Sequence, residues 1–323
     1  MFAEINLNLY EFYKSVFTRL KHFQINGFSE LTMAALKAQS LKISEIARNL
    51  PEKMPFHSKR TKTERFLNNE RVKTSELQRQ YLNYLFKMFF SFSRKIKVKI
   101  IVDYTDFHNC RILHAGIPCR GRVFPIFFKA FSIKETNDYS LKNVEETFLR
   151  ILKELLPLDY EYILIADRGF GNERFINLCE SIGFFFVLRI KQSFHVLKNN
   201  KRIIASDVKD KLNKDVDYKG HKLGLVITEE NDQKWYLLTN LQDLRVVKGI
   251  YEERFWTEEY FRDLKHYFQG GNLRYNMAVL KKLLLIGQIC YNFVFDIGLK
   301  ENIDISQLSA SPLSFFPQGF LAN

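Results

Sequence analysis

Hydrophobic residues near the N-terminus recur at the spacing of an amphipathic helix. At about 100° per residue, one face carries Leu9, Phe12, Tyr13, Val16, Phe17 and Leu20. Further along, Ser44 is placed to cap a short helix that ends before Pro51. The pattern predicts helices throughout residues 1–92 and a helical N-terminal domain over residues 1–94.

Near Lys95 the helical spacing gives way to the pattern of strands. The segment KIKVKIIVDYTDFHN alternates cations with apolar residues and then stays apolar as far as Val102. That is typical of a strand that runs from a sheet edge into the core. The segments ILHAGIP and RVFPIFFKAFS predict two further antiparallel strands.

Helices and strands then alternate. Ser140 or Asn143 opens a helix that ends before Pro157. The segment EYILIADRGFG predicts a fourth strand that is apolar up to Asp167. A short helix ending at Gly183 and a fifth strand in FFFVLRI complete the series. The predicted order is β-β-β-α-β-α-β, with an aspartate ending the first and fourth strands, and this order alone fits more than one fold.

Residues 192–241 interrupt this alternation. They contain turn pairs and short β-like runs such as HKLGLVIT and KWYLLTN, which predict a β-rich insertion. Residues 95–191 and 242–300 are then expected to form one core, and residues 301–323 a C-terminal tail.

The segment from Tyr251 to Lys265 predicts an amphipathic helix with a mixed polar stripe. The polar side carries Tyr251, Arg254, Glu258, Arg262 and Lys265, and the apolar side carries Trp256, Tyr260, Phe261, Leu264 and Phe268. The spacing of Arg254, Glu258 and Arg262 is that of a solvated salt-bridge ladder. The same residue types suit a carboxylate that holds a metal ion between cations that hold phosphates, and periodicity leaves both interpretations open.

Positive charge is concentrated toward the N-terminus. The chain of 323 residues has a formal net charge of +13, and residues 1–97 hold 18 Lys and Arg against 8 Asp and Glu, which is +10 of that total. The densest cluster consists of Lys59, Arg60, Lys62, Arg65, Arg71 and Lys73. We expect a helix–turn–helix-like pair with a basic second member that contacts DNA through Lys59, Arg60, Lys62 and Arg65. A solvated, well-charged surface is the alternative.

Composition narrows the class of protein. Hydrophobic residues make up 46% of the chain, enough for a substantial core. The four cysteines form no C-x-x-C pair, which argues against zinc modules and a disulfide framework and fits a reducing cytosol. The first residues show no signal-peptide pattern. Residues 283–295 are apolar but short, and Gln288 and Asn292 interrupt them, so they predict a buried helix.

Three acidic residues on separate elements are candidate metal ligands. Asp103 and Asp167 follow apolar strands, and Glu258 lies on the predicted helix. Hard cations such as Mg²⁺ prefer carboxylate oxygens, and two ions about 4 Å apart activate a hydroxyl nucleophile and stabilise the leaving oxygen. Each residue alone is more often a cap or a surface residue. Strand alternation places Asp103 and Asp106 on opposite faces without selecting either.

In series, IIVDYTD, LIADRGFG and Tyr-x2-Arg-x3-Glu-x6-Lys resemble the motifs of DDE transposases, in particular the Y-R-E-K signature group of bacterial cut-and-paste insertion sequences. LKISEIARNLP resembles the N-terminal DNA-binding region of that family. The resemblance implies an α/β fold with a ribonuclease-H-like mixed sheet flanked by helices. It also implies that Asp103, Asp167 and Glu258 are catalytic and bind two Mg²⁺ ions, with Mn²⁺ as a substitute. It selects Asp103 over Asp106, which is left as a cap or a support for the ligands.

The resemblance also implies DNA contacts. The residues expected to hold the DNA backbone at the transposon end are Tyr251, Arg254, Arg262 and Lys265. Arg168 is expected at a phosphate near the scissile bond, or else in a salt bridge to a neighbouring glutamate. Trp235 aligns with a tryptophan that stacks on a flipped base, or else is an ordinary interface tryptophan.

The implied activity is cleavage at transposon ends, by way of a hairpin, and strand transfer into target DNA. The implied partners are double-stranded DNA, as terminal inverted repeats and target, and a second copy of the chain on paired ends. No membrane partner is expected, and the implied location is the bacterial cytoplasm, at the nucleoid. Members of the family commonly have a longer C-terminal helical region. A structure-specific nuclease that cuts without joining, and a decayed copy that only binds DNA, are the alternatives.

Overall fold

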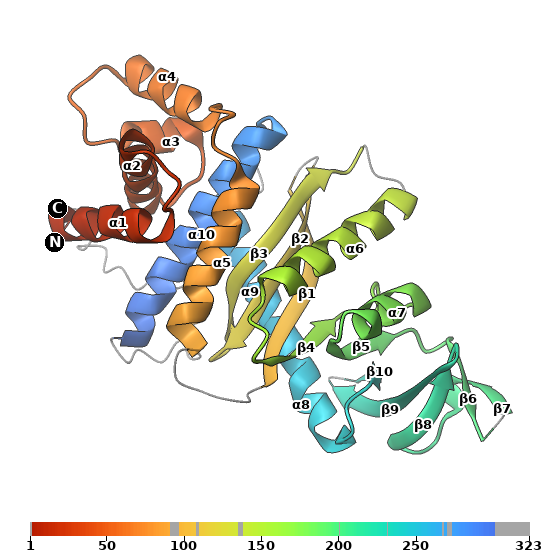
Figure 1. Cartoon of the computed structure of the whole chain (residues 1–323). Coiled ribbons are helices and arrows are strands. Elements are labelled where there is room, and N and C mark those ends of the chain that lie inside the picture. The colour runs from red at the N-terminus through yellow and green to blue at the C-terminus, as the bar shows by residue number, and fades with distance from the viewer. Residues whose placement is uncertain are drawn as a thin grey trace.

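The structure is a computed structural model, and it describes residues 2–90, 97–107, 110–134, 138–199, 201–230, 232–266, 268–269 and 273–300. The predicted tail over residues 301–323 lies outside the described residues. Figure 1 shows N-terminal helices at one end, a twisted sheet in the middle and a strand-rich lobe at the other end.

Five helices form the N-terminal part of the chain. They are α1 (Phe2–Val16), α2 (His22–Ala38), α3 (Ile43–Arg48), α4 (Phe56–Leu67) and α5 (Thr74–Phe90). Buried aromatic rings join α1 to α2: Tyr13 stacks on Phe28 with ring centroids 5.7 Å apart, and its hydroxyl lies 2.5 Å from that of Thr32. Ser44 lies inside α3 and does not cap it, because the helix begins at Ile43.

One mixed sheet runs through the molecule in the order β3-β2-β1-β4-β5-β10-β9-β8-β6-β7. Its first half consists of β1 (Lys97–Phe107), β2 (Cys110–Cys119), β3 (Arg122–Ser132), β4 (Glu161–Ala166) and β5 (Phe185–Ile190). Strands β1, β4 and β5 are parallel, β2 pairs antiparallel with β1, and β3 pairs antiparallel with β2. The helices α6 (Asp138–Leu155) and α7 (Glu173–Ser181) connect β3 to β4 and β4 to β5. Helices cover these strands, so their apolar runs are buried on both faces.

The segment predicted as a β-rich insertion extends the same sheet. It contains β6 (His195–Lys198), β7 (Lys201–Ile204), the short turn η1 (Ala205–Asp207), β8 (Leu212–Tyr218), β9 (His221–Glu230) and β10 (Gln233–Thr239). Strand β10 pairs antiparallel with β5, with Leu238 opposite Leu188. The Asn240 side chain accepts a hydrogen bond from the Phe186 backbone N–H at 2.9 Å. The sheet is therefore continuous across the predicted boundary at residue 191.

The predicted helix from Tyr251 to Lys265 is divided. After the short turn η2 (Leu244–Val246), the structure has α8 (Val247–Glu252), the 3₁₀ turn η3 (Glu253–Phe255) and α9 (Trp256–His266). A 3₁₀ turn has about three residues per turn, so it changes the phase of the side chains that follow. The prediction of one polar stripe is therefore wrong in its first half: Tyr251 and Arg254 are buried, whereas Glu258 and Arg262 are exposed.

The long apolar helix α10 (Met277–Lys300) packs on β3, α2 and α5. Its residues Met277–Phe295 are long and apolar enough to cross a membrane, and 83% of that window is buried inside the protein. The sequence-based argument underestimated the length of the apolar helix. The burial of the helix agrees with the prediction that it lies in the core. Gln288 and Asn292 donate hydrogen bonds to the Pro125 carbonyl at 3.0 and 2.9 Å, which gives their side-chain N–H groups a partner inside the core, whereas no partner is found among the described residues for their side-chain oxygens.

Candidate active site

Two aspartates lie side by side, each one residue beyond the last pair of the parallel ladder between β1 and β4. The last pair of that ladder is Val102 opposite Ala166, so Asp103 and Asp167 are the next residues on adjacent strands. The prediction that the first strand ends at Asp103 is wrong, because β1 continues to Phe107 by pairing with β2. The register of two parallel strands, not the end of both, brings the two carboxylates together.

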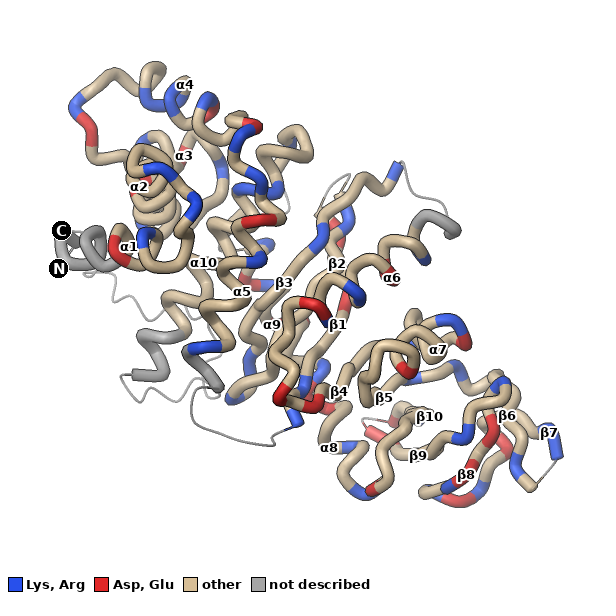
Figure 2. Tube along the Cα trace, viewed as in Figure 1, with Lys and Arg blue, Asp and Glu red and all other residues tan. Residues whose placement is uncertain are grey.

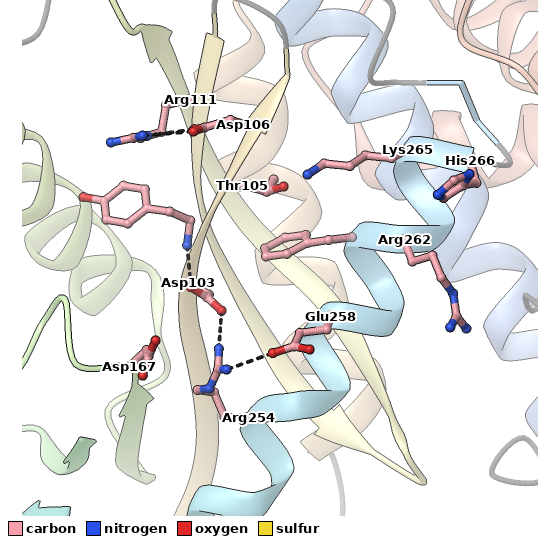
Figure 3. A pocket seen from close by; sticks show the side chains of 12 residues that line it. Asp103, Thr105, Asp106, Arg111, Asp167, Arg254, Glu258, Arg262, Lys265 and His266 are labelled. Atoms are coloured by element: carbon pink, nitrogen blue, oxygen red, sulfur yellow. Dashed lines mark hydrogen bonds and ion pairs between the residues drawn. The ribbon is translucent and has the colours of Figure 1, made fainter. Parts of the chain in front are cut away.

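Arg254 joins Asp103 to Glu258 (Figure 3). Its Nη1 donates to Asp103 Oδ2 at 2.7 Å, and its Nη2 donates to Glu258 Oε1 at 2.9 Å. The other oxygen of Asp103, Oδ1, accepts from the Tyr104 backbone N–H at 2.8 Å. Arg262 pairs with Glu259 instead of Glu258, so the salt-bridge ladder has its first step only.

Negative charge exceeds positive charge around Arg254. Burial raises the pKa of Asp103, and Asp167 and Glu258 raise it further, although Arg254 and the Tyr104 N–H oppose them. Burial disfavours the charged form of Arg254, but Asp103 and the other anions outweigh it, so the pKa of the guanidinium lies above its ordinary value. Both directions are expected where three carboxylates surround one guanidinium.

Tyr251 contacts Asp167, and Trp235 packs against Tyr251. The Tyr251 hydroxyl donates to Asp167 Oδ1 at 3.1 Å, and burial raises the pKa of that phenol. The Trp235 indole stacks on Phe255 at 5.3 Å and meets Tyr251 edge-on at 5.2 Å. Because Trp235 is buried, a flipped base reaches its face only if Phe255 moves aside. The buried position agrees with the alternative of an ordinary packed tryptophan.

Cations predicted to bind DNA occupy different places around the site. Arg262 and Lys265 line the same cavity as the carboxylates. In Figure 3, Lys265 points toward Asp106, while the guanidinium of Arg262 points away from the Asp103 group. Arg168 is exposed and does not line this cavity. Within the described residues, Arg168 has no ion pair, so the predicted bridge to a glutamate is not found there.

Asp106 lies within β1 opposite Arg111 of β2. Its carboxylate accepts two hydrogen bonds from Arg111, at 2.7 and 2.9 Å, and they lower the pKa of Asp106. It therefore belongs to a cross-strand ion pair and not to a cap.

Ion pairs on either side of Glu258 hold η3 and α9 to the sheet. Arg122 of β3, whose side chain is only 4% exposed, donates to Glu259 at 2.7 Å, and Lys99 of β1 pairs with Glu253. These contacts fix the backbone that carries Glu258. Their partners are far apart in the sequence, so no local pattern indicated them.

The cavity at this site has a volume of about 610 Å³, and we call it the carboxylate cavity. It is lined by four cations and other residues, and by the carboxylates of Asp103, Asp106, Asp167 and Glu258. The donor set suits a hard divalent cation, since carboxylate oxygens are the ligands that such ions prefer. In the described part of the chain, no three Asp, Glu, His or Cys side chains stand close enough to share one ion. The reason is visible in Figure 3, where the guanidinium of Arg254 lies between Asp103 and Glu258.

The four N-terminal cations predicted to bind DNA all lie on α4, along which Figure 2 shows Lys and Arg. Lys59 donates to the Leu50 carbonyl at 2.6 Å. Arg60 pairs with Glu64 on the same helix, and Lys62 pairs with glutamates of neighbouring segments. Arg65 is exposed, and no ion pair is found for it among the described residues.

Comparison with known proteins finds a family domain in part of the chain. Residues 138–293 match the family model of the transposase DDE domain. The chain carries a DDE transposase domain. The match to the DDE domain includes Asp167 and Glu258, whereas Asp103 precedes it. A search of curated proteins found no match. Among solved structures, the chain is similar to piggyBac transposase in its synaptic complex with hairpin DNA, with 12% identity, a TM-score of 0.47, and coverage of 99% of this chain and 76% of that one.

One buried residue beside Asp103 was not singled out from the sequence. His114 of β2 lies opposite Asp103 in the register, and its ring lies 4.8 Å from that of Tyr260 and 5.7 Å from that of Phe261. Neither ring nitrogen has a hydrogen-bond partner among the described residues, and burial lowers the pKa of His114 to about 3. The imidazole is therefore neutral and forms part of the apolar layer between α9 and the sheet.

Proposed function

We propose that this protein is a DNA transposase that cuts DNA at the carboxylate cavity and joins the freed 3′ end to target DNA. The observation that carries the proposal is the level placement of Asp103 and Asp167 on adjacent parallel strands, with Glu258 linked to Asp103 through Arg254. The strand order β3-β2-β1-β4-β5 is in keeping with a ribonuclease-H-like core, which we include in the proposal.

In this proposal Asp103, Asp167 and Glu258 hold two Mg²⁺ ions, for which Mn²⁺ substitutes. Bound there, the metal would activate a water molecule or the 3′-hydroxyl of the DNA and stabilise the leaving oxygen. Arg254 neutralises Asp103 and Glu258 in the structure, and its guanidinium would have to move for both carboxylates to hold the same metal ion. Arg262 and Lys265, which line the cavity, contact DNA phosphates, and Arg168 contacts a phosphate outside it.

The proposed partner is double-stranded DNA with terminal inverted repeats, bound in part by the basic face of α4. Arg65 is the first candidate there, because it is exposed, whereas Lys59, Arg60 and Lys62 are engaged in contacts within the protein. We further propose a homodimer on paired ends, since each end must be held while the other is cut, and a bacterial cytoplasmic location. A hairpin intermediate with a base held near Trp235 requires the Phe255 ring to move.

The experiment is incubation of the purified chain with Mg²⁺ and DNA that carries the ends of its element and their flanks. Joined products support the transposase. Nicks without joining indicate a structure-specific nuclease, and shifted but uncut DNA indicates a copy that only binds. A protein that neither shifts nor cuts this DNA contradicts the proposal.

A further inference from the structure

A second cavity lies beside the carboxylate cavity, where β3 ends and α10 begins. Its volume is about 590 Å³, and the side chains that matter here are Phe107, Lys129, Phe131, Arg274, Tyr275 and Lys281. We call it the cation cavity. Its walls come from the core sheet and α10, and from the segment that precedes α10.

The cation cavity contains positive charge without matching negative charge. Lys129, Arg274 and Lys281 line it, and among the described residues no Asp or Glu does. No ion pair is found for these three cations within the described ranges. Burial lowers the pKa of Lys129, and the nearby ammonium of Lys281 lowers it further. Two like charges held together in this way indicate a place where an anion would relieve repulsion.

The start of α10 adds to the positive potential. The helix begins at Met277 and is 24 residues long, and its N-terminus carries a partial positive charge. The Asn276 side chain caps it by accepting from the Val279 backbone N–H at 2.9 Å. The helix end alone would not make a site, but it lies among three cations in the wall of a cavity.

Aromatic rings form the apolar part of the wall. Phe107 is buried at the end of β1, and Phe131 and Tyr275 are half-buried. The Tyr275 hydroxyl accepts from the Ile43 backbone N–H at 2.9 Å, so this wall is tied to α3 of the N-terminal helices. Cations beside partly exposed aromatic rings, here Phe131 and Tyr275, are the combination with which proteins hold the phosphate and sugar or base of a nucleic acid strand.

The cation cavity lies between two regions already assigned to DNA. On one side, the ammonium of Lys265, in the carboxylate cavity, lies 5.7 Å from the centroid of the Phe107 ring. On the other side, Asn276 donates to Asn68 at the end of α4 at 3.1 Å. A strand that runs from α4 to the carboxylates therefore passes the cation cavity.

We propose that Lys129, Arg274 and Lys281 hold a backbone phosphodiester of the DNA strand that enters the carboxylate cavity. The inference rests on the proposed function and adds a phosphate site to it. The same chemistry would also accept free inorganic phosphate. The position between α4 and the carboxylates favours the phosphodiester of a polymer.

The test uses a double variant that carries both Lys129→Gln and Lys281→Gln. Its control is the single variant Lys87→Gln. Each of the three substitutions removes one positive charge and keeps most of the aliphatic part of the side chain. Lys87 is exposed in the last turn of α5. Helix α10 runs alongside α5 in the same direction. Lys282, near its start, contacts the carbonyl of Leu67, which precedes α5 in the sequence, and Asn292, further along, contacts Tyr81 within α5. Lys87 is therefore at the far end from the cation cavity.

Fluorescence anisotropy measures affinity for a duplex of roughly 30 base pairs between about 50 and 200 mM salt, with thermal melting as a check of folding. The double variant should bind roughly tenfold more weakly at the lowest salt. Its plot of log K against log salt should be shallower by about 0.9 for each phosphate that the variant no longer neutralises. Lys87→Gln should keep the parental slope.

Each other outcome overturns the inference in a recognisable way. If the parent and the double variant have the same slope while both bind DNA, the cation cavity holds no DNA phosphate and the proposed function stands. If inorganic phosphate binds the parent saturably, fails to bind the double variant, and the DNA slope is the same for both proteins, the ligand is free phosphate. If the parent neither binds nor cuts DNA, the proposed function fails and takes this inference with it.

Discussion

The carboxylate cavity and the cation cavity are neighbours of nearly equal volume, about 610 and 590 Å³, but their charges are arranged differently. In the carboxylate cavity cations meet partners: Arg254 contacts Asp103 and Glu258, and Arg111 contacts Asp106. In the cation cavity no carboxylate among the described residues faces Lys129, Arg274 or Lys281.

The difference indicates what each cavity can bind. Arg254 contacts two carboxylates, those of Asp103 and Glu258, and a third, that of Asp167, lies nearby, so this part of the site gains by taking up a cation. The cation cavity gains by taking up an anion. A polyanionic strand placed across both would be attracted by the second and repelled at the first unless divalent cations entered with it. This arrangement of charge supports our proposal that the two cavities act together on a phosphodiester with the help of a metal ion.

Removal of the carboxylates should have the largest effect on this comparison. Asp103→Ala, Asp167→Ala or Glu258→Ala should each abolish DNA cleavage, because the loss of groups that stabilise developing charge typically raises a barrier by on the order of 3 kcal/mol or more. DNA binding should be unchanged or slightly tighter, since an anion beside a phosphate is removed. A nicking assay and a gel shift on the same proteins measure both. If Glu258→Ala cuts at the parental rate, α9 contributes only a salt bridge.

Arg254→Ala should have the next largest effect, on stability. It removes the buried partner of Asp103 and leaves carboxylates without compensation, which typically costs about 3 kcal/mol. Urea denaturation measures the loss. The matched control is Arg262→Ala on α9, whose exposed pair with Glu259 should be worth about 0.5 kcal/mol. Equal losses for the two variants would mean that Arg254 is not the link between the sheet and α9.

His114 should make the layer beneath the carboxylate cavity sensitive to acid. Its folded pKa of about 3 lies below the unfolded value of about 6.5. The unfolded chain therefore takes up the proton first, and stability that is present above pH 6.5 is lost as the pH falls. At pH 5 the loss should be about 2 kcal/mol.

The measurement for His114 is the free energy of unfolding at pH 7 and pH 5. His114→Leu keeps the position apolar and removes the titrating group, so its stability should fall less between the two values. An identical fall in parent and variant would show that other groups cause the acid sensitivity. Asp103 acts in the opposite sense, because its raised pKa favours the folded state as the pH falls.

Asp106→Ala should have the smallest effect and serves as the internal control for the carboxylates. Its pair with Arg111 is partly exposed, with side-chain exposures of 49% and 35%, so its loss should cost about 0.5 kcal/mol. Cleavage should persist, since the Asp103, Asp167 and Glu258 carboxylates remain. An inactive Asp106→Ala beside an active Asp103→Ala would reverse the assignment of the first metal ligand.

Local sequence patterns were enough to locate the two strands and the segment 251–265 that carry this site, although not the 3₁₀ turn within that segment. Continuously apolar runs predicted β1 and β4, because strands covered on both faces have no polar side. The aspartates after Val102 and Ala166 followed from those runs. The glutamate among cations in residues 251–265 followed from residue types and spacing. These features are local, because each is encoded by the residue types and spacing within one segment of the chain.

Only the tertiary structure decided how these side chains are used. Arg254 contacts Asp103 across 151 residues of sequence, and the 3₁₀ turn that carries it packs on Trp235 through the ring of Phe255. The cation cavity arises because β3 and the start of α10 meet, which brings Lys129 close to Lys281. Periodicity reports which side of an element is covered, but it does not report what covers it. Register and packing set the long-range pairs, and with them the charge of each cavity.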